Sequence, residues 1–198
     1  MNTLWKPVSN FTKGREHNLT PKAIVIHIGE GSQNIIYQTF LTEPKSSHYC
    51  VSRKGEIWQF VSEQDTAWHA GYVVSPRAEI LNQFPYNPNS YTLGIEAEGY
   101  ADQEPTPEYY KSCAELVKML CAKYKIPLHA DYIIPHRAIR KDKTCPGRIS
   151  CGKIIDLAQA PVPIPQIQPI TPTYAPQIQP NVSIPEWLKN FLYRNKKV

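Results

Sequence analysis

Three side chains that could bind a soft metal ion are the most telling feature of this sequence. His27 lies at the end of an apolar run, and His136 and Cys145 follow more than a hundred residues later, nine positions apart. Two imidazoles and a thiolate suit zinc, and three protein ligands leave its fourth tetrahedral position open for water. Structural zinc sites usually close all four positions, so an incomplete set indicates chemistry if the three residues meet in space. Taken singly, a core histidine and a buried turn thiol remain the simpler interpretations.

The elements that must position these residues follow from the apolar pattern. Residues 22–28 are rich in β-branched side chains and are followed by Gly29, which predicts a buried strand that carries His27. Residues 132–134 predict a short strand that delivers His136 to its end. Between them the sequence predicts a short helix and three further strands, two of them joined by a glycine-containing turn: 32–41, 48–52, 56–61 and 92–98.

The clearest helix covers residues 107–124. Thr106 suits its N-cap, and Pro107 suits its first turn, where the missing N–H has no partner to lose. The apolar residues of this segment fall on one helical face, which makes Cys113 and Cys121 core residues rather than metal ligands. Strands and helices therefore alternate, and residues 1–158 are expected to form one α/β domain.

Bulk composition excludes few classes of protein. The 198 residues are 41% hydrophobic and 20% charged, as in a globular domain, and the net charge of +5 favours anionic partners without choosing among nucleic acid, membrane surface and cell wall. No apolar leader and no stretch of about 20 apolar residues is present, so we expect a soluble cytoplasmic product. Five loosely spaced cysteines do not resemble a disulfide framework, which favours reduced thiols.

The composition changes abruptly after Asp156. Residues 157–185 contain no charged side chain, and the pentapeptide at 165–169 recurs at 176–180. Proline fixes φ and lacks an N–H donor, so we expect residues 159–182 to form an extended, stiff spacer.

The last residues, 183–198, are expected to form a short cationic amphipathic helix. A helix of this length is only marginally stable in isolation, so we expect it to pack against another surface. Its own domain or a second copy is the simpler surface, and a wall, membrane or partner protein is the alternative. The apolar stripe that would dock consists of Trp187, Leu188, Phe191 and Leu192.

Five short segments, in order, resemble the zinc-dependent N-acetylmuramoyl-L-alanine amidases, a family that includes phage lysozyme-type amidases and peptidoglycan recognition proteins. The resemblance covers about 23–147, and its segments are 24–27, 46–49 before the turn at Gly55, 67–71, 89–96, and 135–136 with 143–147. It implies a mixed central β-sheet flanked by helices, with zinc at the floor of an open groove.

The resemblance also implies roles for residues. His27, His136 and Cys145 would bind Zn²⁺, Glu96 would be the general base, and Lys143 would stabilise the oxyanion. The simpler interpretations are a solvent-facing strand carboxylate for Glu96 and a solvated loop lysine for Lys143.

Three further residues are expected near the substrate. Trp68 and His69 would line the cleft, with a structural pair as the alternative. His48 would contact substrate or support the site through a hydrogen bond. Ser47 occupies the position at which some relatives carry a tyrosine that takes part in catalysis. That role should be absent here, and Glu96 should perform it alone.

The expected activity is hydrolysis of the amide between N-acetylmuramic acid and L-alanine in peptidoglycan. The expected partners are peptidoglycan or muropeptides rather than nucleic acid. A phage endolysin is the first interpretation, with a cytoplasmic muropeptide-recycling amidase and an injected toxin as alternatives. A non-catalytic peptidoglycan-binding module is a further possibility. A structural zinc protein would need Cys151 as its fourth ligand.

Overall fold

Strand β3 (Ala23–Ile28) is an inner strand of the main sheet, next to its edge strand, in a computed structural model that describes residues 2–161 and 186. β7 (Thr92–Ala97) pairs with it in parallel on one side and β8 (Ile133–Pro135) on the other. The three strands predicted around the site residues are therefore confirmed. Ala23–Ile26 are fully buried, as their apolar character predicted.

The main sheet has six strands in the order β1-β5-β4-β7-β3-β8. β4 (Tyr49–Val51) and β5 (Ile57–Gln59) pair antiparallel across the turn at Gly55, as predicted, and the other pairs are parallel. The sheet is therefore mixed. Three short strands were not predicted, namely β1 (Thr3–Trp5) at the edge of this sheet and the pair β2 (Phe11–Thr12) and β6 (Thr66–Ala67), which forms a second, two-stranded sheet.

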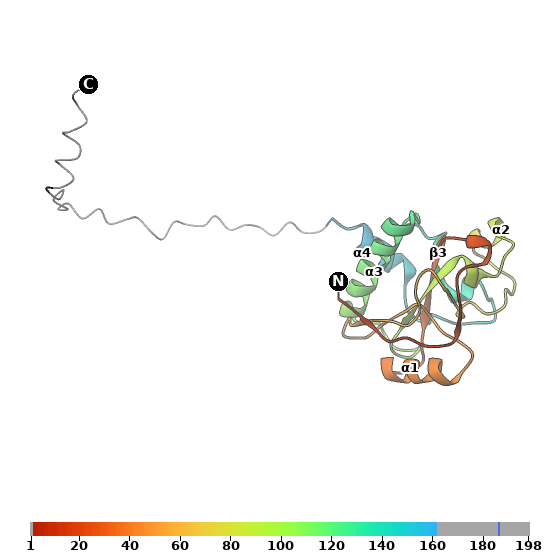
Figure 1. The fold of residues 1–198 in the computed structure, drawn as a ribbon, viewed down its shortest axis with the longest axis horizontal. Coiled ribbons are helices and arrows are strands. Elements are labelled where there is room, and N and C mark those ends of the chain that lie inside the picture. Colours follow the sequence, from red (N-terminus) through yellow and green to blue (C-terminus); the bar gives the residue numbers. More distant parts are fainter. Residues whose placement is uncertain (1, 162–185, 187–198) are drawn as a thin grey trace, which may run out of the picture. The chain divides into compact units, whose positions relative to one another are not determined.

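Helices cover both faces of the main sheet. α3 (Pro107–Tyr124) and α4 (Cys151–Gln159) lie side by side (Figure 1) and pack against the face that carries Ile24, Ile26 and Ile95. α1 (Gln33–Thr42) packs against the opposite face at Cys50. A short helix, α2 (Ile80–Gln83), covers Ala23 and Val25 on that same opposite face. The expected α/β architecture with flanking helices is confirmed.

The main helix begins as its sequence predicts. The Thr106 side chain accepts a hydrogen bond from the backbone N–H of Tyr109, and Pro107 occupies the first turn. The helix ends at Tyr124, and Lys125 follows with φ of 56°. Cys113 and Cys121 are buried in the core, as expected. α4 was not predicted, although Ser150 caps it through a bond from the N–H of Lys153.

The described residues also contain three 3-10 helices: η1 (Glu16–Asn18), η2 (Pro88–Ser90) and η3 (His136–Ala138). The described residues up to Pro161 form one compact unit. The expected spacer and terminal helix, including the stripe Trp187, Leu188, Phe191 and Leu192, lie outside the described residues. Within the part that is described, no helix is both long and apolar enough to cross a bilayer.

Candidate metal centre and active site

His27 and His136 emerge side by side at the ends of two parallel strands. Ile26 on β3 pairs with Pro135 on β8, so the next residue of each strand reaches the same edge of the sheet. The two imidazole ring centroids lie 4.5 Å apart. The two predicted strands therefore bring the two imidazoles close enough to bind one metal ion.

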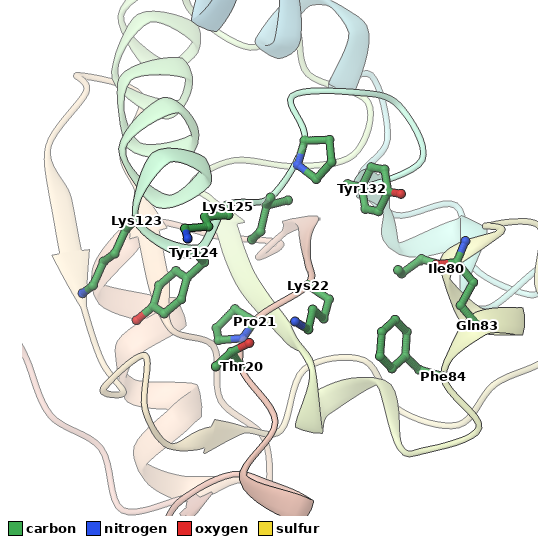
Figure 2. A pocket seen from close by; sticks show the side chains of 12 residues that line it. Thr20, Pro21, Lys22, Ile80, Gln83, Phe84, Lys123, Tyr124, Lys125 and Tyr132 are labelled. Carbon is green, nitrogen blue, oxygen red and sulfur yellow. The ribbon is translucent and has the colours of Figure 1, made fainter.

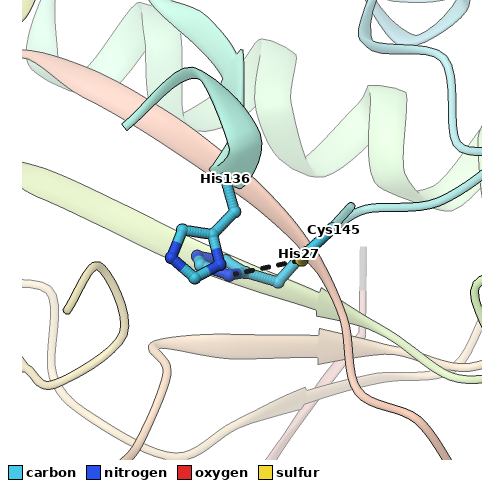
Figure 3. Close-up of side chains that lie close together, drawn as sticks. All are labelled: His27, His136 and Cys145. Atoms are coloured by element: carbon cyan, nitrogen blue, oxygen red, sulfur yellow. Dashed lines mark hydrogen bonds between the residues drawn. The ribbon is translucent and has the colours of Figure 1, made fainter. Parts of the chain in front are cut away.

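Cys145 joins the pair from the loop that follows η3 (Figure 3). Its Sγ lies 3.9 Å from Nδ1 of His27 and accepts a hydrogen bond from the backbone N–H of Ile28 at 3.3 Å. One ligand atom from each of His27, His136 and Cys145 lies within 4.8 Å of the others. Across residues 2–161 and 186, no other group of three such side chains is found. The three residues therefore meet in space.

Glu96 lies beside this cluster on the neighbouring strand. It pairs in register with His27, which places both side chains on the same face, opposite that of Ile95. The carboxylate is only 8% exposed, and its Oε2 has no hydrogen-bond partner. Burial raises the pKa of Glu96 to about 8, and the Lys45 cation opposes this rise. The interpretation as a solvent-facing carboxylate is therefore wrong.

Burial also determines the charge of the three candidate ligands. It lowers the pKa of His27 well below 6.5, an effect that His136 and His69 reinforce, and it lowers that of His136. Both imidazoles are thus neutral near pH 7, the form that binds metals. Burial and the nearby Glu96 raise the pKa of the Cys145 thiol to about 12. A bound dication would favour the thiolate and the carboxylate, so metal binding would release protons.

The remaining histidines predicted at the site lie behind it. His69 is 9% exposed, and its Nδ1 lies 3.1 Å from Nε2 of His27. His48 is fully buried, where it accepts a bond from the backbone N–H of Gly94 and lies 3.1 Å from the Arg15 guanidinium. His48 has no surface open to a substrate in this structure, and its hydrogen bonds fit the alternative role, support of the site from behind. That role stays a prediction.

Trp68 lines a cavity of about 450 Å³ together with Arg15 and Asn89. Its indole N–H donates to the Thr12 hydroxyl at 3.0 Å. A second cavity, of about 480 Å³, is lined by three lysines and three aromatic side chains (Figure 2). It contains Lys22, which precedes the first residue of β3, so it lies at the other end of that strand from the metal ligands.

Lys143 lies in the loop between η3 and Cys145, and its side chain is exposed. Burial lowers the pKa of His136, and the cations of Arg140 and Lys143 lower it further. The positive charge of Lys143 therefore acts on His136, one of the three candidate ligands.

Cys151 does not belong to the cluster. It is the first residue of α4 and packs, partly buried, against the core cluster that contains Tyr109 and Cys113 of α3. The structural zinc site with Cys151 as the fourth ligand therefore finds no support in the described residues.

Three residues that hold the site together were missed in the sequence. Asn89 accepts hydrogen bonds from the backbone N–H groups of His69 and Ala70. The Thr92 hydroxyl is hydrogen-bonded to the His69 ring. Arg15 donates to the carbonyl oxygens of Glu63 and Ser90. Asn89 and Thr92 fall within the segment 89–96 that supports the resemblance, which is the signal that could have singled them out. No local pattern marks Arg15 as a partly buried cation.

A family model described as N-acetylmuramoyl-L-alanine amidase matches residues 17–148. Among curated proteins, the chain is 35% identical over 104 residues to the 1,6-anhydro-N-acetylmuramyl-L-alanine amidase AmpD of Haemophilus influenzae, a match that covers 52% of each chain. It is 31% identical over 137 residues to the N-acetylmuramoyl-L-alanine amidase AmiD of Escherichia coli, covering 59% of this chain and 47% of the relative. The chain thus spans about half the length of these relatives.

Solved structures share the fold. A selenomethionine derivative of AmpD superposes with a TM-score of 0.64 at 23% identity, covering 78% of this chain and 93% of that one. A mutant endolysin from Bacillus subtilis superposes with a TM-score of 0.59 at 20% identity, covering 79% and 98%.

Proposed function

Because the chain belongs to the N-acetylmuramoyl-L-alanine amidase family, we propose that it hydrolyses the amide bond between the lactyl group of N-acetylmuramic acid and the L-alanine of a peptidoglycan stem peptide. The observation that carries this proposal is the convergence of two neutral imidazoles and a thiol beside a buried carboxylate with an unpartnered oxygen. Metal-dependent hydrolases use these parts to attack an unactivated amide.

The donor set fits zinc. Two nitrogens and one sulfur are its preferred protein ligands, and His27, His136 and Cys145 would hold it. When bound, the ion supplies a Lewis acid that polarises the scissile carbonyl and makes a water molecule acidic near neutral pH. The unpartnered Oε2 of Glu96 is a further sign of fit, because a buried carboxylate oxygen is costly without a cation or donor nearby.

In the proposed reaction Glu96 accepts the proton of the attacking water and passes it to the leaving amine of L-alanine. Its burial and raised pKa suit a group that must both take and return a proton near neutral pH. The ammonium of Lys143 stabilises the negative charge that develops on the carbonyl oxygen. Arg140, which could compete for this role, is bonded to Asp142 instead.

The test is an amine-release assay on purified sacculi. New L-alanine amino groups should appear with the full chain, should vanish after treatment with a chelator, and should return when Zn²⁺ is added. Activity that persists in chelator would overturn the metal-dependent mechanism. Binding to sacculi without amine release would identify a peptidoglycan-binding module instead.

Two substrates remain to be distinguished within this chemistry. Intact wall peptidoglycan is the substrate expected of an endolysin. A soluble anhydromuropeptide is the second candidate, favoured by the curated relatives named as 1,6-anhydro-N-acetylmuramyl-L-alanine amidases. The ratio of kcat/KM on the soluble muropeptide to the rate on sacculi decides between them: a recycling enzyme should act on the soluble compound and leave intact sacculi almost uncut.

A further inference from the structure

A chain of hydrogen bonds behind His27 has only one consistent direction. It ends at the carbonyl oxygen of Pro88, which can only accept, so the Thr92 hydroxyl donates its single proton there over 2.6 Å. Towards His69 the Thr92 oxygen can therefore only accept. Because Nε2 of His69 lies 3.3 Å from that oxygen, this nitrogen carries a proton.

The same reasoning fixes the tautomer of His27. His69 is 9% exposed, and its ring nitrogens face Thr92 and His27 rather than a carboxylate that would hold an imidazolium, so a proton at Nε2 leaves its Nδ1 bare. That nitrogen accepts a hydrogen bond from Nε2–H of His27 over 3.1 Å. Nδ1 of His27 is then unprotonated, and it faces the sulfur of Cys145 at 3.9 Å.

His136 reaches the same state through a backbone group. Its Nε2 lies 3.0 Å from the carbonyl oxygen of Ala70, which can only accept. Nε2 of His136 therefore donates, and its Nδ1 is free. Both candidate imidazole ligands are thus held from behind at Nε2, by two consecutive residues.

The dipeptide His69–Ala70 is itself held in place. The side-chain oxygen of Asn89 accepts a hydrogen bond from the backbone N–H of His69 at 3.0 Å and another from that of Ala70 at 2.8 Å. Gly94 leaves room for the His69 ring, since a Cβ at that position would lie 2.6 Å from the ring Cγ.

From this arrangement we propose that His69 and Ala70 are the outer shell of the metal site. The side chain of His69 and the carbonyl of Ala70 fix both imidazoles in the tautomer that presents Nδ1, and Asn89 anchors the two residues. His69 is accordingly a positioning residue and makes no substrate contact. The proposal rests on metal binding by the site, and groups that orient metal-binding histidines in this way are worth about 10–100-fold in affinity.

The first test needs no variant. Long-range ¹H–¹⁵N NMR spectra of the full chain, stripped of metal at pH 7, report which ring nitrogen of each histidine is protonated. We expect a proton on Nε2 and a bare Nδ1 for His27, His69 and His136. A protonated Nδ1 on His27 or His136 would overturn the proposal.

The second test compares two nearly isosteric substitutions. His69→Asn keeps an acceptor where Nδ1 lies, whereas His69→Leu removes it. Zn²⁺ affinity, measured by competition with a chromophoric chelator, should fall about 10–100-fold in His69→Leu and only a few-fold in His69→Asn. The absorption spectrum of the Co²⁺ form should change in the leucine variant, which a loss of packing alone would not explain once circular dichroism shows both metal-free variants folded.

Thr92 offers a matched pair with less disturbance to the core. Thr92→Val keeps the branched shape of a fully buried strand residue but removes the hydroxyl, and Thr92→Ser keeps the hydroxyl. Zn²⁺ affinity should fall in the valine variant and be largely retained in the serine variant. Equal affinity in parent, Thr92→Val and His69→Leu would refute the outer-shell role. Failure of the parent to bind Zn²⁺ tightly would instead refute the proposed function.

Discussion

Replacing Gly94 by alanine tests the packing on which the outer shell depends. Gly94 lies on β7, and an added Cβ would lie 2.6 Å from Cγ of His69 and 2.9 Å from its Nδ1. Cγ is the root of the ring and not the end of a flexible chain, so the ring itself must move. Reaching the 3.4 Å at which ordinary contact begins requires a shift of about 0.8 Å.

That shift is large compared with the hydrogen bonds it disturbs. The His69 ring nitrogens lie 3.1 Å from His27 and 3.3 Å from Thr92, so a movement of this size away from either partner breaks the bond. Overpacking of a buried site typically costs about 1–3 kcal/mol. We therefore expect Gly94→Ala to lower the free energy of unfolding by that amount and to lower Zn²⁺ affinity at least about tenfold.

Gly152 provides the control for this substitution. It lies in α4, where an added Cβ would meet only the Ser150 hydroxyl at 3.7 Å. Gly152→Ala should stabilise the helix by up to about 1 kcal/mol and leave metal affinity unchanged. Urea denaturation of the metal-free variants and chelator competition provide the two measurements. If Gly94→Ala matches the parent in both, the His69 ring does not depend on the space that Gly94 leaves.

Three further changes test other parts of the site and fold. Glu96→Gln should retain Zn²⁺ but lower kcat about 10²–10⁴-fold, as expected for loss of a general base. Lys143→Met should lower kcat about 10²–10³-fold with little change in KM, whereas Lys141→Met, at a neighbouring exposed lysine, should not. Burial raises the pKa of Glu63, but hydrogen bonds from Lys123 and two tyrosines outweigh it and lower the pKa below its ordinary value of 4.5. Because a lowered pKa stabilises the folded state above pH 4.5 and this contribution is lost below it, acidification from pH 5 to 3 should destabilise the parent more than Glu63→Gln.

Each of these predictions has a contrary outcome. Near-normal turnover in Glu96→Gln would remove that residue from proton transfer. Equal kcat losses in the two lysine variants would indicate a general effect of positive charge. The urea midpoint measured at each pH reports the stability of the parent and of Glu63→Gln. If both lose stability equally on acidification, the charge of Glu63 makes no net contribution to the free energy of unfolding.

The apolar pattern predicted the parts of the fold that are long or buried. The strand that carries His27 and the helix at 107–124 have clear periodicity and a cap, and both form as expected. β2, β6 and α2 contain two to four residues, too few to show any period. β1 lies at the sheet edge with Trp5 half exposed, so no burial pattern marks it.

The candidate site was predicted unevenly for a related reason. His27 and Glu96 are chemically distinctive residues and occupy directly paired positions of neighbouring strands. The family resemblance of segment 67–71, and no pattern in the residues themselves, implied that His69 faces the substrate. The structure buries it, and burial of a histidine depends on partners such as Thr92 and Gly94 that are distant in the chain.

The outer shell also shows why such support is hard to read from residue types. Ala70 contributes through its carbonyl, which every residue has, and Asn89 acts on backbone N–H groups rather than on a side chain. Gly94 contributes because it has no Cβ, which would clash with the His69 ring. These positions come from the segments 67–71 and 89–96, and a single packing arrangement, the His69 ring against β7, accounts for their dependence on one another. Substitutions at these positions should therefore change the orientation of the two histidine ligands, and with it the Zn²⁺ affinity, although the substituted residues do not bind the metal themselves.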